Sequence, residues 1–432
     1  MEEIEVEEKF MMVAKTMAGL EDLLIEELTA LGAQNVEKLY RAVSFEGDNA
    51  LMYKANYLCR TALRILKPVA NFVARNEMAL YNNVNKIEWH KVFNINQTFA
   101  IDAVVSGPYF THSQYASLRV KDAIADEFRQ HCGARPSVDT DNPNLRINVY
   151  IENEKVTLSY DSSGDSLHKR GYRKTVDKAP INEVLAAGLI KLTEWNYDCN
   201  FYDCMCGSGT IPIEAAMAAM NIPAGYFRER YGFMSWRDFD VDTWNAVKAE
   251  ADDAIRDFDF EIFASDHSAK AVEIARQNIA CAHLSHDINL SKQDMFELMP
   301  GEGGGIMVIN PPYGERLEED NIAEFYRKIG DTLKHNFIGF TAWIISSNND
   351  VLKLIGLKPS KKIELFNGPL ECRFERFDVF DGSFKDRKSG ISYEIFDPDN
   401  DEARQALLSM KDENDDDSQL EAYPIEDAES EE

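Results

Sequence analysis

The spacing of apolar and polar residues divides the chain into two regions of different character. Up to about residue 160, short stretches with the period of strands are mixed with helical repeats such as GLEDLLIEELTALGA at 19–33. We expect strands at 10–16, 39–45, 98–106, 146–153 and 155–162, and helices at 19–33, 48–59, near Asn83 and at 115–128. The last two strands, separated by a short polar turn, predict a hairpin, and the whole order is that of a compact α+β region.

From about residue 180, strands and helices alternate, which is typical of a parallel sheet. Strands are expected at 200–205, 261–266, 288–294, 306–310, 341–347, 361–367 and 373–380. The segment NGPLE at 367–371 joins the last two strands as a hairpin. The sequence therefore predicts a doubly wound α/β domain whose sheet is parallel except for one antiparallel strand.

The first of these strands leads into a glycine turn and a helix, NFYDCMCGSGTIPIE at 200–214. Asp203 ends the strand and Gly207 and Gly209 supply the turn, which is how α/β domains receive a nucleotide-like ligand. Pro212 stands where a dinucleotide site requires a third glycine, so a pyrophosphate ligand is disfavoured. A carboxylate with close-approach glycines suits a cation attached to adenosine, and the alternative is a tight turn without a ligand.

A second motif follows a later strand, GIMVINPPYGER at 305–316. The consecutive prolines Pro311 and Pro312 exclude helix and sheet ladder and stiffen the backbone. They present the side-chain oxygen of Asn310 and a neighbouring main-chain carbonyl as fixed acceptors, with the ring of Tyr313 beside them. Such a set can hold both hydrogens of a planar NH2 group and stack the group on the ring, whereas the alternative is a surface turn.

Two further acids end strands of the same predicted sheet. Asp266 is placed to accept hydrogen bonds from ribose hydroxyls, and Asp294 to accept from an adenine amino group. With Asp203 and Asn310 they fall at the carboxyl ends of four successive strands, the edge where an open α/β sheet binds its ligand.

The glycine turn and the N-P-P-Y motif together resemble those of class I methyltransferases that modify planar NH2 groups. More narrowly, the chain is similar to the THUMP-domain 23S ribosomal RNA guanine-N2 methyltransferases. DSSGDSLHKRGYR at 161–173 and APINEVLAAGLI at 179–190 resemble the passage between that family's RNA-binding and catalytic domains, and 17–33 resembles its start. The resemblance covers about 10–385. It departs at Cys204, where the family commonly has Pro, and some members carry a second methyltransferase domain.

The resemblance implies five regions along the chain. They are a ferredoxin-like α+β subdomain at 1–66, a THUMP RNA-binding domain at 67–160, a linker with a basic patch at 161–179, a seven-stranded Rossmann-like class I methyltransferase domain at 180–396 and an acidic tail at 397–432. We expect this tail to be disordered, because it contains the run DENDDD.

The resemblance also implies a cofactor, S-adenosyl-L-methionine, and a target, the exocyclic N2 amino group of a guanine in 23S ribosomal RNA. The expected catalytic residues are Asn310, Pro311, Pro312 and Tyr313. The expected cofactor-binding residues are Pro180, Asp203, Cys206, Gly207, Gly209, Thr210, Asp266 and Asp294.

A formal net charge of −29 is unusual for a protein that binds RNA. Part of it is local, since residues 411–432 carry −10 and residues 1–9 carry −4, which leaves −15 for the rest. A short stretch is basic and contains an aromatic residue, so it could meet phosphates while the ring stacks on a base, or it could be an ordinary solvated linker. The expected RNA-binding residues are Lys169, Arg170, Tyr172, Arg173 and Lys174.

Composition excludes several other classes of protein. No apolar run reaches the length of a membrane span, and MEEIEVEEKF is acidic where a signal peptide is basic. Seven cysteines at irregular spacings indicate reduced thiols, and Cys199, Cys204 and Cys206 lack the second pair of ligands that a zinc site needs. We therefore expect a cytoplasmic protein without a metal site.

Three other functions are compatible with the same motifs. DNA adenine-N6 methylation and methylation of a protein glutamine amide use the same acceptor geometry, and a non-catalytic RNA-binding protein could retain the fold. The N-terminal 160 residues favour RNA over DNA, since a DNA enzyme is expected to carry a basic target-recognition domain there. An aromatic and arginine-rich insertion at 226–244 either packs internally, which we favour, or faces substrate.

Overall fold

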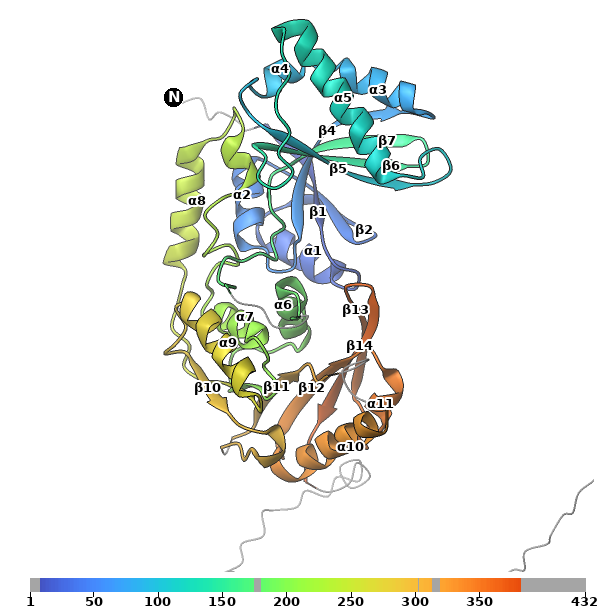
Figure 1. Ribbon diagram of the computed structural model, residues 1–432. Coiled ribbons are helices and arrows are strands. Elements are labelled where there is room, and N and C mark those ends of the chain that lie inside the picture. Colours follow the sequence, from blue (N-terminus) through green and yellow to red (C-terminus); the bar gives the residue numbers. More distant parts are fainter. Residues whose placement is uncertain (1–7, 175–179, 302, 313–318, 382–432) are drawn as a thin grey trace, which may run out of the picture. The chain divides into compact units, whose positions relative to one another are not determined.

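The computed structural model describes residues 8–174, 180–301, 303–312 and 319–381 (Figure 1). These ranges contain two sheets of seven strands each. Tyr313 and the acidic tail predicted at 397–432 lie outside the described residues.

The N-terminal sheet has the strand order β2-β3-β1-β4-β7-β6-β5. Its strands are β1 (Phe10–Lys15), β2 (Gln34–Leu39), β3 (Ala42–Gly47), β4 (Arg64–Val73), β5 (Phe99–Ser106), β6 (Leu145–Glu152) and β7 (Lys155–Asp161). Its helices are α1 (Glu21–Ala30), α2 (Asn49–Leu58), α3 (Glu77–Asn85), α4 (Trp89–Val92) and α5 (Ser113–Cys132). The predicted hairpin is confirmed, because β6 and β7 pair in antiparallel register.

Strand β4 is one of two strands of this sheet, with β2, that the hydrophobic pattern missed. Pro68 interrupts the alternation of β4 and lies at a register shift in the ladder. The first residues of β4 pair with β1, and the stretch from Leu66 to Val73 pairs with β7. The expected domain border after residue 66 therefore falls inside a strand that belongs to one continuous sheet.

The strand expected at 39–45 corresponds to β3, but its hairpin partner β2 was not predicted. The structure has a hairpin there, with β2 ending at Leu39 and β3 beginning at Ala42. The chain reverses at Arg41, whose φ of 55° is left-handed, a conformation that a run of apolar residues does not reveal.

The second sheet has the order β10-β9-β8-β11-β12-β14-β13. Its strands are β8 (Phe201–Asp203), β9 (Ile262–Asp266), β10 (Ile288–Lys292), β11 (Gly305–Ile309), β12 (Phe340–Ser346), β13 (Lys361–Asn367) and β14 (Leu370–Asp378). The helices in this half of the chain are α6 (Glu183–Leu192), α7 (Thr210–Ala219), α8 (Val241–Asp253), α9 (Ala269–Cys281), α10 (Glu319–Asn336) and α11 (Asn349–Lys353), of which α8 packs against α2. Only β14 is antiparallel to its neighbours, so the predicted sheet is confirmed.

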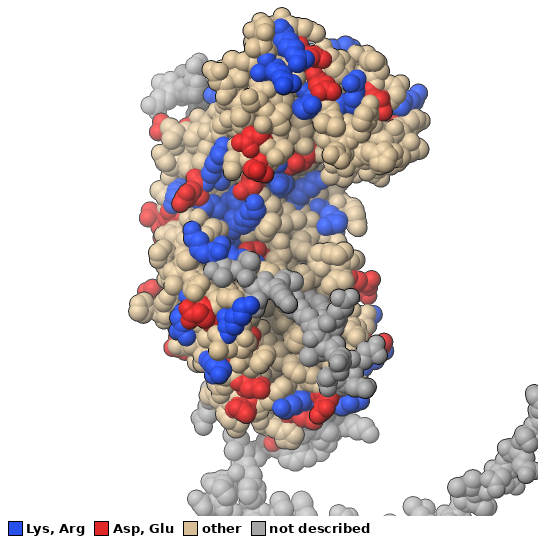
Figure 2. Space-filling model, in the orientation of Figure 1, with Lys and Arg blue, Asp and Glu red and all other residues tan. Residues whose placement is uncertain are grey.

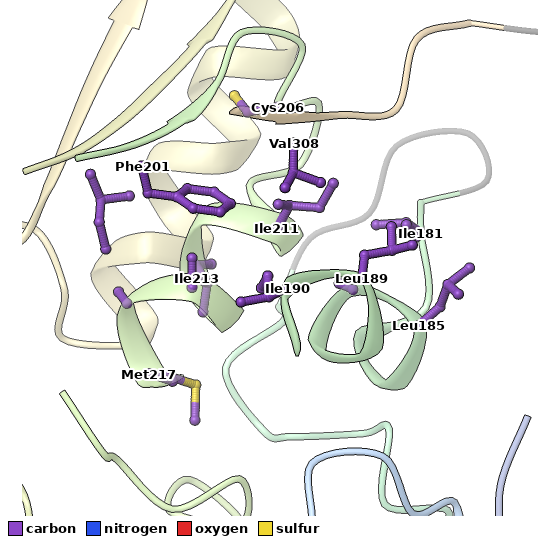
Figure 3. Close-up of a cluster of buried hydrophobic side chains, with 14 of the residues drawn as sticks. Ile181, Leu185, Leu189, Ile190, Phe201, Cys206, Ile211, Ile213, Met217 and Val308 are labelled. Carbon is purple, nitrogen blue, oxygen red and sulfur yellow. The ribbon is translucent and has the colours of Figure 1, made fainter. Parts of the chain in front are cut away.

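Helices α6 and α7 are apolar on nearly every side, and both are buried. Every residue of α7, TIPIEAAMAA, is buried. Figure 3 shows side chains of the two helices meeting residues of β8 and β11 in one cluster: Leu185, Leu189, Ile190, Phe201, Ile211, Ile213, Met217 and Val308. Each fully buried Leu or Ile side chain contributes about 1.5–3 kcal/mol. This packing fixes the start of α7, and with it the glycine turn, against the sheet.

The insertion between α7 and β9 packs against helix α2. Phe233 lies 4.5 Å from Tyr53 and Trp244 lies 5.4 Å from Tyr57, measured between ring centroids. Tyr231 joins the same buried cluster. These contacts support the packing interpretation for Tyr231, Phe233 and Trp244.

The surface charge is distributed unevenly. On the face drawn in Figure 2, Lys and Arg side chains form several groups with acidic side chains between them. All seven cysteines lie within the described ranges, and none of them forms a disulfide. None of the described helices combines the length and the apolar character needed to cross a bilayer.

Candidate active site

A cavity of 420 Å³ opens at the carboxyl ends of β8, β9 and β11, where an open α/β sheet binds its ligand. The predicted residues that line it are Pro180, Asp203, Cys206, Gly207, Thr210, Asp266, Asp294, Asn310 and Pro312. Sequence reasoning missed other lining residues, among them Ile181, Met205, Ser208, His267, Ser268, Phe296 and Phe325. Most of these are chain neighbours of a predicted residue, whereas Phe325 comes from α10 and carried no signal in the sequence.

Three predicted residues are not placed in this lining. Gly209 has a φ of 81° and begins α7, and a Cβ on it would lie 3.2 Å from the Cβ of Ala275. It therefore permits the turn and the close approach of α7 to α9. Pro311 is buried, and Tyr313 lies outside the described residues.

Asp203 carries a buried oxygen without a partner. Its Oδ1 accepts a hydrogen bond from the Met205 amide at 3.2 Å, whereas Oδ2 has no partner among the described residues. Burial, reinforced by the charge of Asp266, raises the pKa of this carboxyl well above its ordinary value. An unsatisfied buried polar group costs about 1–3 kcal/mol, which a ligand cation or donor in the cavity would relieve. The site thus fits a ligand with an ammonium or N–H group at this point.

Asp266 holds the glycine turn in place. Its Oδ2 accepts from the Gly207 amide at 3.0 Å, and its Oδ1 accepts from the Ser268 amide at 2.9 Å. Asp294 is arranged similarly, since its Oδ1 accepts from the Phe296 amide at 3.0 Å. Each carboxylate oxygen can accept more than one hydrogen bond, so both acids retain acceptor capacity toward the cavity.

Asn310 provides the second unsatisfied acceptor of the cavity. It directly follows β11, and its Oδ1 is buried with no partner among the described residues. Pro312 lines the cavity beside it. The arrangement leaves the Asn310 oxygen available to a donor that enters the site.

A larger cavity of 640 Å³ lies beside strand β10, but its chemistry is different. Tyr202 and Phe263 form part of its wall, and Arg276 is the sole charged residue among those that line it. It contains none of the strand-end acids and lacks Asn310. We therefore assign the candidate active site to the smaller cavity.

Residues 169–174 were expected to form a basic patch that binds RNA at the surface. For Arg170 and Tyr172 this prediction is wrong, because both side chains are buried. Arg170 pairs with Glu214 of α7 at 3.4 Å and donates to the carbonyls of Leu167 and Arg60 at 3.0 and 2.5 Å. The Tyr172 hydroxyl donates to Glu214 at 2.9 Å. Burial opposes the charge of Arg170, but Glu214 and Tyr172 more than offset it and leave the pKa of Arg170 raised. Lys169 and Lys174 are exposed.

Arg173 connects the same linker to the candidate active site. Its Nη2 donates to the Thr210 hydroxyl at 2.6 Å and to the carbonyl of Ile181 at 3.0 Å, and its guanidinium pairs with Glu183. Thr210 and Ile181 both line the cavity. Arg173 therefore links two residues that line the cavity, and this part of the linker stabilises the cavity.

Models of three protein families match consecutive parts of the chain. The RlmL ferredoxin-like domain matches residues 11–66, the THUMP domain matches 74–161, and the RMKL-like methyltransferase domain matches 170–376.

Individual proteins are similar over most of the chain. "Putative RNA methyltransferase slr0064" of Synechocystis is 36% identical over 369 residues, which are 85% of this chain and 96% of that protein. The ribosomal RNA large subunit methyltransferase K/L of Methylococcus capsulatus is 35% identical over 86% of this chain, which spans 52% of that longer relative.

A solved structure has the same fold over nearly the same extent. The crystal structure of SMU.472, "a putative methyltransferase complexed with SAH", matches with a TM-score of 0.78 at 28% identity, covering 88% of this chain and 100% of that one. Two seven-stranded sheets, the cavity at the strand ends and these matches lead to one conclusion. The chain belongs to the family of THUMP-domain methyltransferases with an RlmL-like catalytic domain.

Proposed function

We propose that this chain is an S-adenosylmethionine-dependent RNA methyltransferase that modifies the N2 amino group of a guanine in 23S ribosomal RNA. The observation that carries the proposal is the pair of unsatisfied buried oxygens, Asp203 Oδ2 and Asn310 Oδ1, on one cavity at the carboxyl edge of the sheet. Each oxygen can accept a hydrogen bond from a ligand. In the proposed reaction, the cofactor supplies the donor for Asp203 and the target base supplies the donor for Asn310.

The cofactor side of the cavity is formed by the strand-end acids. Asp203 faces the cationic methionine end, Asp266 accepts from the ribose hydroxyls, and Asp294 accepts from the adenine amino group. Cys206, Gly207 and Thr210 complete this side, and Pro180 lines the methionine end. S-adenosylmethionine supplies an electrophilic methyl group when bound. The SAH bound to SMU.472 supports the choice of cofactor.

The substrate side is formed by the N-P-P-Y segment. The lone pair of guanine N2 is delocalised into the ring, so the nitrogen is a poor nucleophile in its planar form. Asn310 Oδ1 accepts one N2 hydrogen and the Pro311 carbonyl accepts the other, which favours the tetrahedral nitrogen as positive charge develops. Tyr313 stacks on the extruded base, and Pro312 stiffens the turn. The nitrogen loses its proton after charge has developed, so no strong general base is needed.

The choice of RNA as the substrate is supported by the N-terminal half of the chain. Residues 74–161 match a THUMP domain, and the relatives from Synechocystis and Methylococcus are named as RNA methyltransferases. The free cysteine thiols are in keeping with a cytoplasmic enzyme.

Mass spectrometry of nucleosides tests the proposal. Purified protein with labelled S-adenosylmethionine should transfer label to ribosomal RNA that lacks the modification, and the product should be N2-methylguanosine. Label in adenine N6 of DNA, or in a protein glutamine, would replace the proposal with one of the alternatives. Cofactor binding without transfer to any substrate would indicate a non-catalytic RNA-binding protein.

A further inference from the structure

A second polar cavity shares no lining residue with the candidate active site and is not used by the proposed chemistry. It measures 260 Å³ and lies between the N-terminal sheet and the insertion. Its lining includes three cations, three aromatic rings and one acid: Lys67, Lys91, Arg237, Phe93, Tyr160, Trp236 and Asp238.

The rings of Trp236 and Tyr160, both partly exposed, form an aromatic wall of the cavity. Trp236 and Tyr160 lie 5.7 Å apart between centroids with their planes at 68°, so their faces point in different directions. The indole Nε1 of Trp236 is buried and has no hydrogen-bond partner among the described residues. A buried indole N–H usually finds a partner, so its environment favours a ligand with an acceptor.

The tyrosine can serve as a second neutral donor. Burial, followed by the charge of Asp238, raises the pKa of Tyr160 to about 12. Its hydroxyl therefore keeps its proton at neutral pH.

The cations are held around this wall by the protein itself. The Nζ of Lys67 lies 3.9 Å from the ring centroid of Phe10 and 3.7 Å from Asp238. Arg237 donates to the carbonyl of Lys91 at 2.7 Å and to Asn94 Oδ1 at 2.7 Å, which fixes its guanidinium. Positive charge exceeds negative charge in the lining by two, in a protein whose net charge is −29.

We propose that this cavity binds one unpaired nucleotide of the RNA strand that is being methylated, and the proposal rests on RNA being the substrate. Aromatic faces combined with Lys and Arg are what single-stranded nucleic acid requires, since the ring takes the base and the cations take the phosphate. Acceptors on the base edge or the phosphate satisfy Trp236 Nε1. The cavity is smaller than the range of about 300–1,000 Å³ that suits larger ligands, which favours a single base with its phosphate.

A pair of matched lysine variants tests the charge component. Lys91 pairs with Glu88, three residues away, at 2.8 Å. Lys353 of α11, which does not line this cavity, forms a pair of the same spacing and distance with Asp350. Both lysines are exposed, so neither Lys91→Gln nor Lys353→Gln should affect folding. Fluorescence anisotropy with a labelled single-stranded fragment of ribosomal RNA should show weaker binding for Lys91→Gln and unchanged binding for Lys353→Gln. The slope of log affinity against log salt should fall by about 0.7 in that variant and remain unchanged in Lys353→Gln.

Ring variants test the stacking component. Trp236→Ala should weaken RNA binding by about fivefold to a hundredfold, and Trp236→Phe, which preserves a ring and the packing, by much less. Ultraviolet crosslinking of the same RNA to the unmodified protein should yield a crosslinked peptide that contains Trp236 or Tyr160. This second measurement stands even where Trp236→Ala does not fold.

The outcomes separate this proposal from the proposed function. The wild-type protein could bind and methylate RNA while the Lys91 and Trp236 variants keep the same RNA affinity and the crosslinks fall on other residues. That result would overturn the nucleotide site and leave the proposed RNA methyltransferase function intact. Binding of guanosine monophosphate that changes Trp236 fluorescence, without any effect of the variants on RNA, would assign the cavity to a free nucleotide instead. Absence of RNA binding by the wild-type protein would overturn both.

Discussion

Two clusters of polar side chains, one in the cavity and one in the linker, were both predicted to bind a ligand, but their environments in the structure differ. In the cavity, Asp203 and Asn310 each bury an oxygen that has no partner among the described residues. In the linker, the side chains of Arg170 and Tyr172 are also buried, but each of them has a polar partner in Glu214.

The difference separates binding groups from supporting groups. A buried polar atom that is satisfied within the protein contributes to stability and has little left to offer a ligand. A buried polar atom that is not satisfied costs stability and gains from a ligand. Variants in the linker should therefore affect unfolding, and variants in the cavity should affect the reaction.

The largest effect is expected when the buried ion pair of the linker is broken. Glu214→Gln leaves the guanidinium of Arg170 in a buried site without a countercharge, which typically costs about 3–5 kcal/mol. Urea unfolding should show this loss. Glu364→Gln is the control, because Glu364 forms an exposed pair with Arg373 that contributes at most about 1 kcal/mol. An unchanged unfolding free energy together with lost RNA affinity would restore the linker as an RNA-binding patch.

The next effect falls on the rate of methyl transfer. Asn310→Ala removes an acceptor whose interaction strengthens as charge develops on the nitrogen, so the rate should fall about a hundredfold, or about 3 kcal/mol. Its free energy of unfolding should not decrease, since the lost oxygen has no partner among the described residues. Asn349→Ala is a matched control, because Asn349 also carries a buried oxygen for which the described part of the chain offers no partner, but it does not line the cavity. Full single-turnover activity of Asn310→Ala would contradict the mechanism.

A smaller effect concerns the pH dependence of cofactor affinity. Because the folded-state pKa of Asp203 is raised, the free protein retains a proton that an ordinary aspartate has lost. A cationic cofactor prefers the carboxylate, so affinity should rise with pH by up to about tenfold per pH unit and level off above the folded pKa. Without cofactor, the same shift lowers stability as pH rises from the ordinary aspartate pKa toward the folded one.

Calorimetry in buffers of different ionisation enthalpy measures the proton released on binding. Asp203→Asn should bind the cofactor more weakly and without this pH dependence. The same slope in the Asn variant would mean that another group is responsible.

The smallest effect is expected for Tyr172→Phe. It removes the hydroxyl that donates to Glu214 at 2.9 Å and should lower the free energy of unfolding by about 1 kcal/mol. RNA affinity at matched salt should be unchanged, because the ring is buried. A clear loss of RNA affinity with unchanged stability would mean that the ring reaches the RNA after all.

The sequence by itself determined the catalytic sheet and most of the cavity. Strand period, turn residues and the alternation with helices are local signals, and parallel strands bring their carboxyl ends to one edge. Asp203, Asp266, Asp294 and Asn310 each followed a recognisable strand, so their meeting in one cavity could be predicted without coordinates.

Only the tertiary structure decided what the linker and the insertion do. Glu214 lies 44 residues from Arg170 along the chain. Tyr53 of α2 packs against Phe233, which comes much later in the sequence, after the glycine turn. A charge or a ring has the same local pattern whether it faces water or a buried partner. Burial depends on which distant segments cover a residue, and that is set by packing between elements and not by the spacing within one.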